Sequence, residues 1–208
     1  MTGRSSPRLS LDPETTALVN VHWQRDIVTR DGAFGPFFAN EVETRNVVKH
    51  AAQVLAVARD HGAMVVHARA AFRPGYPELI RNCALYEQVA ASQCLQEGTP
   101  GAEIIPELTA RADEPVVTHG RISAFQGTEL DLMLRARGIT HVLVTGVATN
   151  VTVEGTARDA VGLGYRTILV ADACSAADHA AHEATLATFQ LLGSTADSDE
   201  LAPAFKRD

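Results

Sequence analysis

The stretch HVLVTGVATNVTVEGTARDAVGLGYRTILVA, residues 141–171, holds two apolar runs on either side of a segment long enough to form a helix. The runs at 141–146 and 165–171 place apolar residues on both faces of an extended chain, which is typical of strands buried within a sheet. Residues 150–163 begin just after a short turn and have the length of a helix. A strand, a helix and a second strand in this order indicate a parallel sheet covered by helices.

The same alternation extends over most of the chain. Further apolar, β-rich runs are separated by further helix-length segments. We therefore predict an α/β fold of three layers, with a parallel sheet between two layers of helices. The additional strands are expected at 16–23, 63–67 and 115–118, and the additional helices at 42–59, 128–137 and 178–192.

The length and composition of the chain indicate one domain with a sizeable core. The chain has 208 residues, of which 46% are hydrophobic and 21% are charged. We expect a single domain over 1–208, with an N-terminal extension at 1–14. Residues 72–106 form one long irregular region, from RPGYPE near its start to GTPGAEIIPEL at its end. An excursion of this length is more often a lid or an oligomer contact than a plain loop.

Charge and hydropathy limit the environment and the partners of the protein. The 18 Lys and Arg against 25 Asp and Glu give a net charge of -7 without long runs of one sign, so nucleic acid is not an expected partner. The N-terminus lacks the apolar core of a signal peptide, and no stretch approaches the roughly 20 apolar residues of a membrane helix. We therefore expect a cytoplasmic protein without a membrane partner. Cys83, Cys94 and Cys174 have neither CxxC spacing nor an even count, which predicts free thiols.

Three polar positions follow predicted strands. His22 lies at the end of the first strand, His119 lies just beyond the third, and residues 148–152 follow the fourth and begin a helix. Ligands of open α/β sheets bind beyond the carboxyl ends of the strands, so these positions should converge. The free N–H groups at a helix start favour a carboxylate or a developing oxyanion. The sequence therefore predicts a small-molecule site at this edge of the sheet.

Six motifs spread over most of the chain point to a known family. They are ALVNVHWQRDIV, FRPGYPE, GTPGAEIIPEL, VVTHGRISAFQGTELDLMLRARGI, GVATNVTVEGTARDA and VADACSAADHAAHEATL. With these motifs the chain resembles the isochorismatase-like, or cysteine hydrolase, superfamily. The resemblance implies a Rossmann-like parallel sheet of about six strands and assembly into homodimers or homotetramers. It also implies a cis peptide between Val147 and Ala148 that shapes an oxyanion pocket.

The resemblance locates a catalytic triad, and all three of its positions are substituted in this chain. The family's aspartate, lysine and cysteine fall at His22, His119 and Thr152, respectively. A threonine hydroxyl is far less acidic than a thiol, whose free pKa is about 8.5. The family's attack by a thiolate therefore does not carry over to this chain.

Other positions are expected to bind substrate or to stabilise an oxyanion, namely Ala148 and Thr152 at the helix start, together with Arg121 and Asp26. Arg121 belongs to the retained RISAF pattern after the third strand and is chemically able to pair with Glu154. Asp26 matches a second acidic residue of the family's opening motif, and it supplies the missing carboxylate if its loop turns inward. Pocket-lining residues are expected within 34–38 and 72–86, but their identities do not reveal the substrate.

Three functions fit the substituted site. The first is a hydrolase for a small polar or cyclic metabolite that uses no cysteine, with His22 as acid or base, His119 polarising an oxygen and Thr152 orienting substrate or water. In the second, Thr152 is itself the nucleophile, activated by His22, although it lacks the terminal amine that usually activates threonine. The third is a pseudoenzyme that binds a small metabolite or supports an oligomer. Taken singly, each histidine also fits a buried structural role, and Thr152 fits a helix cap.

Histidines near strand ends raise the question of a metal site. His22, His67 and His119 have the chemistry of the ligands of a catalytic zinc. His67, however, matches no metal position of the family, so we expect no metal and no other cofactor. His179 and His182, spaced i and i+3 on the last predicted long helix, are expected on a solvated face.

Overall fold

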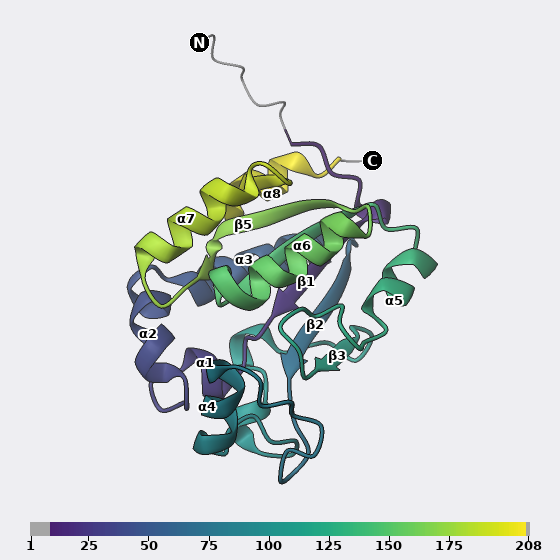
Figure 1. Ribbon diagram of the computed structural model, residues 1–208. Coiled ribbons are helices and arrows are strands. Elements are labelled where there is room, and N and C mark those ends of the chain that lie inside the picture. Colours follow the sequence, from purple (N-terminus) through teal and green to yellow (C-terminus); the bar gives the residue numbers. More distant parts are fainter. Residues whose placement is uncertain (1–8, 207–208) are drawn as a thin grey trace.

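A parallel sheet of six strands runs through the molecule and confirms the predicted α/β fold (Figure 1). The structure, a computed structural model, describes residues 9–206. The strand order β3-β2-β1-β4-β5-β6 places β1 between β2 and β4. Every neighbouring pair is parallel, so each connection crosses a face of the sheet before the next strand begins. The strands are β1 (Thr16–Val21), β2 (Met64–Ala70), β3 (Val116–His119), β4 (His141–Val147), β5 (Arg166–Ser175) and β6 (Ser194–Ala196).

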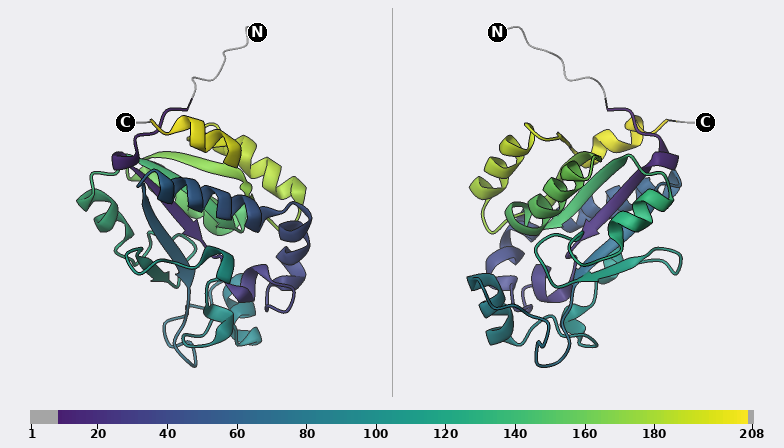
Figure 2. Two further views of the ribbon diagram at one scale, coloured as in Figure 1. Left: turned by 180° about the vertical axis from the view of Figure 1, so that it is seen from behind. Right: turned by 45° about the vertical axis from the view of Figure 1, so that its right-hand side comes forward.

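Helices cover both faces of the sheet (Figure 2). Side chains of α2, α3 and α8 pack into the buried cluster on one face, and side chains of α5, α6 and α7 pack into the cluster on the other. The two clusters draw on alternate strand residues, because successive side chains of a strand point to opposite faces. Leu18 and Leu143 belong to the first cluster, and Val19 and Val144 belong to the second. The helices are α1 (Arg25–Val28), α2 (Gly35–Thr44), α3 (Val47–Asp60), α4 (Ala84–Ser92), α5 (Leu130–Ala136), α6 (Glu154–Gly162), α7 (His179–Phe189) and α8 (Ser198–Ala204).

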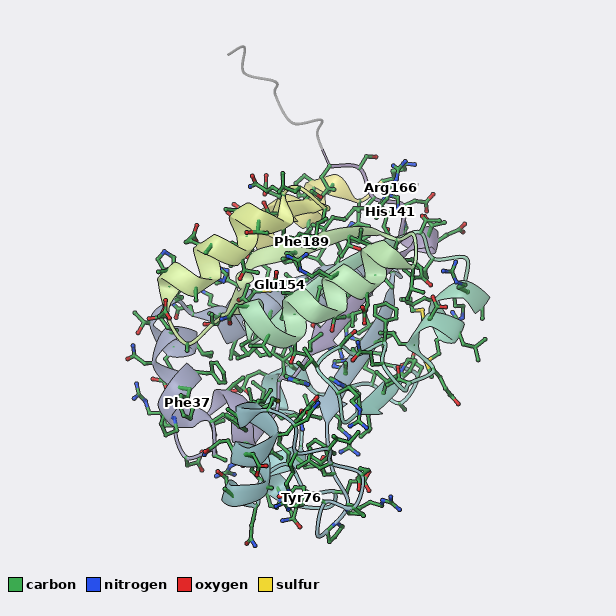
Figure 3. The ribbon with its side chains drawn as sticks, in the orientation of Figure 1. Phe37, Tyr76, His141, Glu154, Arg166 and Phe189 are labelled. Atoms are coloured by element: carbon green, nitrogen blue, oxygen red, sulfur yellow. The ribbon has the colours of Figure 1, made fainter. Side chains whose placement is uncertain are left out.

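Side chains fill the space between the layers and leave few large apolar groups outside (Figure 3). Phe189 of α7 is fully enclosed in the second cluster, whereas Phe37 of α2 is half exposed. Within residues 9–206, none of the helices combines the length and apolar character needed to cross a membrane.

The segment before β1 packs against the end of the chain. Residues 1–8 of the extension expected at 1–14 lie outside the described residues. Leu11 is fully buried, its N–H donates to the Ala204 carbonyl at 2.8 Å, and its own carbonyl accepts from the Lys206 N–H at 2.9 Å. The described part of the extension is therefore held against α8.

The prediction of one helix over 42–59 is wrong, because the chain forms α2 and α3 with a break between them. Asn46 lies at the break with a φ of 53°, in the left-handed region that asparagine tolerates better than most residues. Arg45 beside it donates from Nη1 to the Cys174 carbonyl at 3.3 Å and lies 3.0 Å from the His182 ring through Nη2. These contacts join segments far apart in the sequence, and local periodicity does not report them.

Candidate active site

The carboxyl ends of the central strands carry the polar residues singled out above. His22 follows β1 directly with a φ of 60°, which turns the chain out of the strand. Its N–H still donates to the Ala68 carbonyl of β2, at 2.9 Å. His119 is the last residue of β3, and β4 ends at Val147, just before the turn that leads into α6. Because all these strands are parallel, their ends meet at one edge of the sheet.

The structure brings the His22 and His119 rings into direct contact. Their Nε2 atoms lie 3.0 Å apart, and the rings stack with centroids 4.8 Å apart and planes at 14°. Nδ1 of His119 lies 2.8 Å from the Arg121 carbonyl. A carbonyl only accepts, so this nitrogen carries a proton. In a neutral His119 the Nε2 atom is then bare, and the proton between the two rings belongs to His22.

Burial keeps both rings neutral near physiological pH. Both side chains are more than nine-tenths buried, and burial lowers the pKa of His119 to about 4. Burial also lowers the pKa of His22 well below its usual value, and the nearby His119 ring lowers it further. The Val147 carbonyl opposes this shift by favouring the protonated form of His22. A neutral His22 that donates through Nε2 has no proton on Nδ1, so it can act as a base, and once protonated it donates to the Val147 carbonyl.

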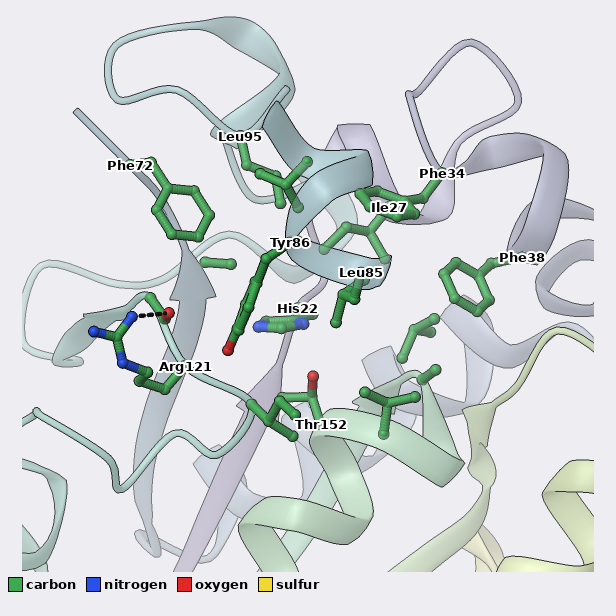
Figure 4. A pocket seen from close by; sticks show the side chains of 17 residues that line it. His22, Ile27, Phe34, Phe38, Phe72, Leu85, Tyr86, Leu95, Arg121 and Thr152 are labelled. Atoms are coloured by element: carbon green, nitrogen blue, oxygen red, sulfur yellow. Dashed lines mark hydrogen bonds between the residues drawn. The ribbon is translucent and has the colours of Figure 1, made fainter. Parts of the chain in front are cut away.

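A pocket of about 590 Å³, part of it open to solvent, lies beside His22 (Figure 4). His22, Arg121, Ala148 and Thr152 line this pocket. His119 does not line it and lies behind His22, in contact with that ring. His22 therefore faces the pocket, and His119 contacts the His22 ring from the side away from the pocket.

Thr152 lies in a single π-helical turn, Thr149–Val153, that connects β4 to α6. The peptide between Val147 and Ala148 is cis, as the resemblance implied. The Ala148 carbonyl then accepts from the N–H groups of Val151 and Val153, each at 3.1 Å. The Thr152 side chain is 4% exposed and lies on the same side of the pocket as the His22 ring (Figure 4).

Asp26 does not line the pocket and is used elsewhere in the structure. Its Oδ2 accepts from the Leu95 N–H at 2.7 Å, and a Cβ at Gly101 would collide with its carboxylate. Asp26, in the chain after β1, therefore contacts the segment 72–106 at Leu95 and at Gly101. The considered pairing of Arg121 with Glu154 is also not formed, because Glu154 accepts from Arg158 at 2.7 Å.

The segment 72–106 supplies much of the pocket wall. It contains the helix α4, and Phe72, Leu85, Tyr86, Val89 and Leu95 from this segment face the pocket. The sequence prediction included the first three and missed Val89 and Leu95. The spacing i, i+4 of two apolar residues at 85 and 89 was the available signal for a helix that covers an apolar surface.

The prediction of a solvated face for His179 and His182 is wrong for His182, which is 1% exposed. Its Nε2 lies 3.0 Å from Arg45 Nη2, and its Nδ1 lies 2.9 Å from the Thr149 hydroxyl. A guanidinium only donates, so Nε2 accepts and Nδ1 carries the proton of a neutral ring. Burial, followed by the charge of Arg45, lowers the pKa of His182 to about 4. His182 thus connects the break between α2 and α3 to the first residue of the turn at the pocket.

The prediction that His67 lies near a strand end is wrong, because β2 continues to Ala70 and His67 lies in its middle. Its Nε2 lies 3.2 Å from Oε2 of Glu114, which also pairs with Arg59. Among residues 9–206 we find no group of three or more His, Cys, Asp or Glu side chains arranged to hold a metal ion.

Comparisons with known proteins agree with this fold. The model of the isochorismatase domain family matches residues 16–200. The isochorismatase family protein YwoC of Bacillus subtilis is 32% identical over 95% of this chain and 98% of its own length. The ureidoacrylate amidohydrolase RutB of Methylorubrum extorquens is 33% identical over 79% of this chain and 71% of its own. A cysteine hydrolase from Pseudomonas syringae pv. phaseolicola, of known structure, has a TM-score of 0.86 at 28% identity, over 97% of this chain and 98% of its own. The chain therefore belongs to the isochorismatase family.

Proposed function

We propose that this protein is a hydrolase that cleaves a small carbonyl compound without a cysteine nucleophile, with His22 as the acid and base. The observation that carries the proposal is the contact of 3.0 Å between Nε2 of His22 and Nε2 of His119, at the wall of a pocket. The similarity to an amidohydrolase supports a substrate with a C–N bond next to a carbonyl group.

In the proposed reaction, His22 accepts a proton from water through its bare Nδ1. The water oxygen bonds to the carbonyl carbon, and the carbonyl electron pair moves to its oxygen. N–H groups at the start of the turn Thr149–Val153 stabilise the negative charge that forms there. The electron pair of the oxyanion then re-forms the C=O bond, the C–N bond breaks with its electron pair on nitrogen, and His22 returns the proton to this leaving group.

His119 acts as a positioning residue in this scheme. Its Nδ1 is held by the Arg121 carbonyl, so its Nε2 always presents a lone pair to His22. This arrangement selects the tautomer of His22 whose free nitrogen is a base. It plays the part that a carboxylate plays for the histidine of a Ser-His-Asp triad.

The test is turnover of a panel of small amides and ureides by wild type and by His22→Ala. We expect the variant to lose about 10² or more of the turnover. The rate should fall as pH drops below the pKa of His22, which lies below the usual imidazole value. His179→Ala, which removes an exposed histidine from α7, is the control and should keep full activity. Equal turnover in wild type and His22→Ala would refute the proposed role.

Thr152→Val separates the proposed mechanism from attack by threonine. If Thr152 only orients water or substrate, we expect a loss of about tenfold and no acyl-enzyme in the mass spectrum. Abolished turnover in the variant, with an acyl group trapped on Thr152 in wild type, would favour the threonine nucleophile. A pseudoenzyme would bind a small molecule and leave it unchanged in both proteins.

A further inference from the structure

The pocket beside His22 is apolar over most of its wall. Aromatic and aliphatic side chains enter it from separate parts of the chain, including Phe34 and Phe38 near the start of α2 and Phe72, Val89 and Leu95 from the segment 72–106. Among the described residues that line the pocket there is no Asp or Glu. A cation held in it would have no counter-charge, and an unpaired buried charge is costly.

Arg121 is the one charged group among the described residues that line the pocket, and its guanidinium is turned aside. Nη1 donates to the Gly120 carbonyl at 2.8 Å, and Figure 4 places the guanidinium across the Tyr86 ring from Leu85, Ile27 and Phe38. The Tyr86 ring thus separates this charge from the body of the pocket. The apolar part offers no ionic partner to an anion.

The polar groups of the pocket gather at one end. Tyr86 of α4 is 8% exposed, and its ring stands beside His22, with Thr152 below (Figure 4). Among the side chains drawn there, the marked hydrogen bond runs from Arg121 to Gly120. The hydroxyl groups of Tyr86 and Thr152 are therefore without a partner among these groups. Neither oxygen is among the fully buried polar atoms that lack a partner, so both keep contact with the open part of the pocket and are available to a ligand.

We infer that the pocket binds an uncharged carbonyl compound with an apolar ring, and that the Tyr86 hydroxyl donates a hydrogen bond to its carbonyl oxygen. The ring lies against Phe34, Phe38 and Leu85, across Tyr86 from Arg121, and the carbonyl group lies at His22. The inference rests on the proposed function in placing that group beside the base. It narrows the expected small polar or cyclic metabolite to a cyclic one with an apolar body.

The experiment measures binding, not turnover, by calorimetry with probes of one shape and different charge. Benzamide is neutral, benzoate is an anion and benzamidine is a cation, while acetamide keeps the amide without the ring. We expect benzamide to bind at least about tenfold more tightly than either charged probe, because the pocket desolvates them without compensation. Acetamide should bind about 10- to 100-fold more weakly than benzamide, because it buries no ring. Tighter binding of a charged probe, equal binding of acetamide, or no binding of benzamide at about 10 mM would overturn the inference.

Tyr86→Phe tests the new binding residue by removing one hydroxyl group. The affinity for benzamide should fall about 3- to 10-fold, as expected for one hydrogen bond. Tyr165→Phe is the matched control, since the Tyr165 hydroxyl donates to Asp131 at 2.7 Å and does not line the pocket. Unchanged affinity in Tyr86→Phe would remove Tyr86 from recognition.

The two proposals fail in different ways. In His22→Ala the binding preference among the probes should persist even though turnover is lost. If wild type binds benzamide as expected but converts no amide, the substrate class stands and the hydrolase proposal falls. If wild type hydrolyses an amide but binds a charged probe more tightly than benzamide, the hydrolase proposal stands and the inferred substrate class is wrong.

Discussion

Replacing His182 by glutamine should make the protein less sensitive to mild acid. His182 is 1% exposed, and its pKa in the folded protein is lowered to about 4. In the unfolded chain an imidazole has a pKa of about 6.5. The unfolded state therefore binds more protons between these values, so stability rises with pH through this window and is lost as pH falls.

The size of the effect follows from the two pKa values. At pH 5.5 the unfolded imidazole is about nine-tenths protonated, whereas the folded one stays almost wholly neutral, and the difference favours unfolding by roughly 1 to 2 kcal/mol. His119 has the same folded pKa of about 4 and adds a similar amount. The two rings together should remove about 3 kcal/mol between pH 7.5 and 5.5, a large part of a typical stability of about 5–15 kcal/mol. Glu114, with its pKa lowered to about 2, acts only in more acid solution.

Glutamine preserves the contacts of His182 while removing its titration. Its Oε1 accepts from Arg45 and its Nε2 donates to Thr149, as the ring does now. We therefore expect little change in the free energy of unfolding at pH 7.5. Between pH 7.5 and 5.5, the variant should lose roughly 1 to 2 kcal/mol less of its free energy of unfolding than wild type does.

The assay is urea unfolding followed by circular dichroism at both pH values. His179→Gln, on the exposed side of the same helix, is the control and should keep most of the wild-type pH difference. If His182→Gln loses as much stability on acidification as wild type does, the buried neutral ring is not a source of the pH dependence, and the tautomer assigned here is wrong.

Two further predictions concern thiols. Burial raises the pKa of Cys94 and Cys174 to about 12, so any hydrolase activity should survive iodoacetamide under conditions that keep the protein folded. Rapid loss of activity together with modification of either thiol would show that the site assigned here is wrong. Restoring the family pattern with His22→Asp, His119→Lys and Thr152→Cys should give a thiol that is alkylated markedly faster than the thiol of Thr152→Cys alone, because a carboxylate and an ammonium then act on it. Equal alkylation rates over the pH range would mean that positions 22 and 119 do not act on position 152.

The order of the first five strands and the edge of the sheet where polar residues gather could be predicted from the sequence. Buried parallel strands need apolar residues on both faces, and that pattern is local and easily detected. The first five strands therefore lie close to their predicted positions, whereas β6 has only three residues and shows no comparable run. The positions of His22, His119 and Thr152 followed from the rule that strand ends meet at one edge.

The way these residues are used depends on how distant elements pack together. Sequence spacing did not reveal that His119 supports His22 from behind, since that depends on a contact between residues 97 apart in the chain. The burial of His182 depends on Arg45, 137 residues away, and the same contacts accompany the break between α2 and α3. The apolar character of the pocket likewise arises where α2, α4 and the turn after β4 meet. Hydrophobic periodicity reports which face of an element is buried, but the partner of each side chain is set by the packing of distant elements.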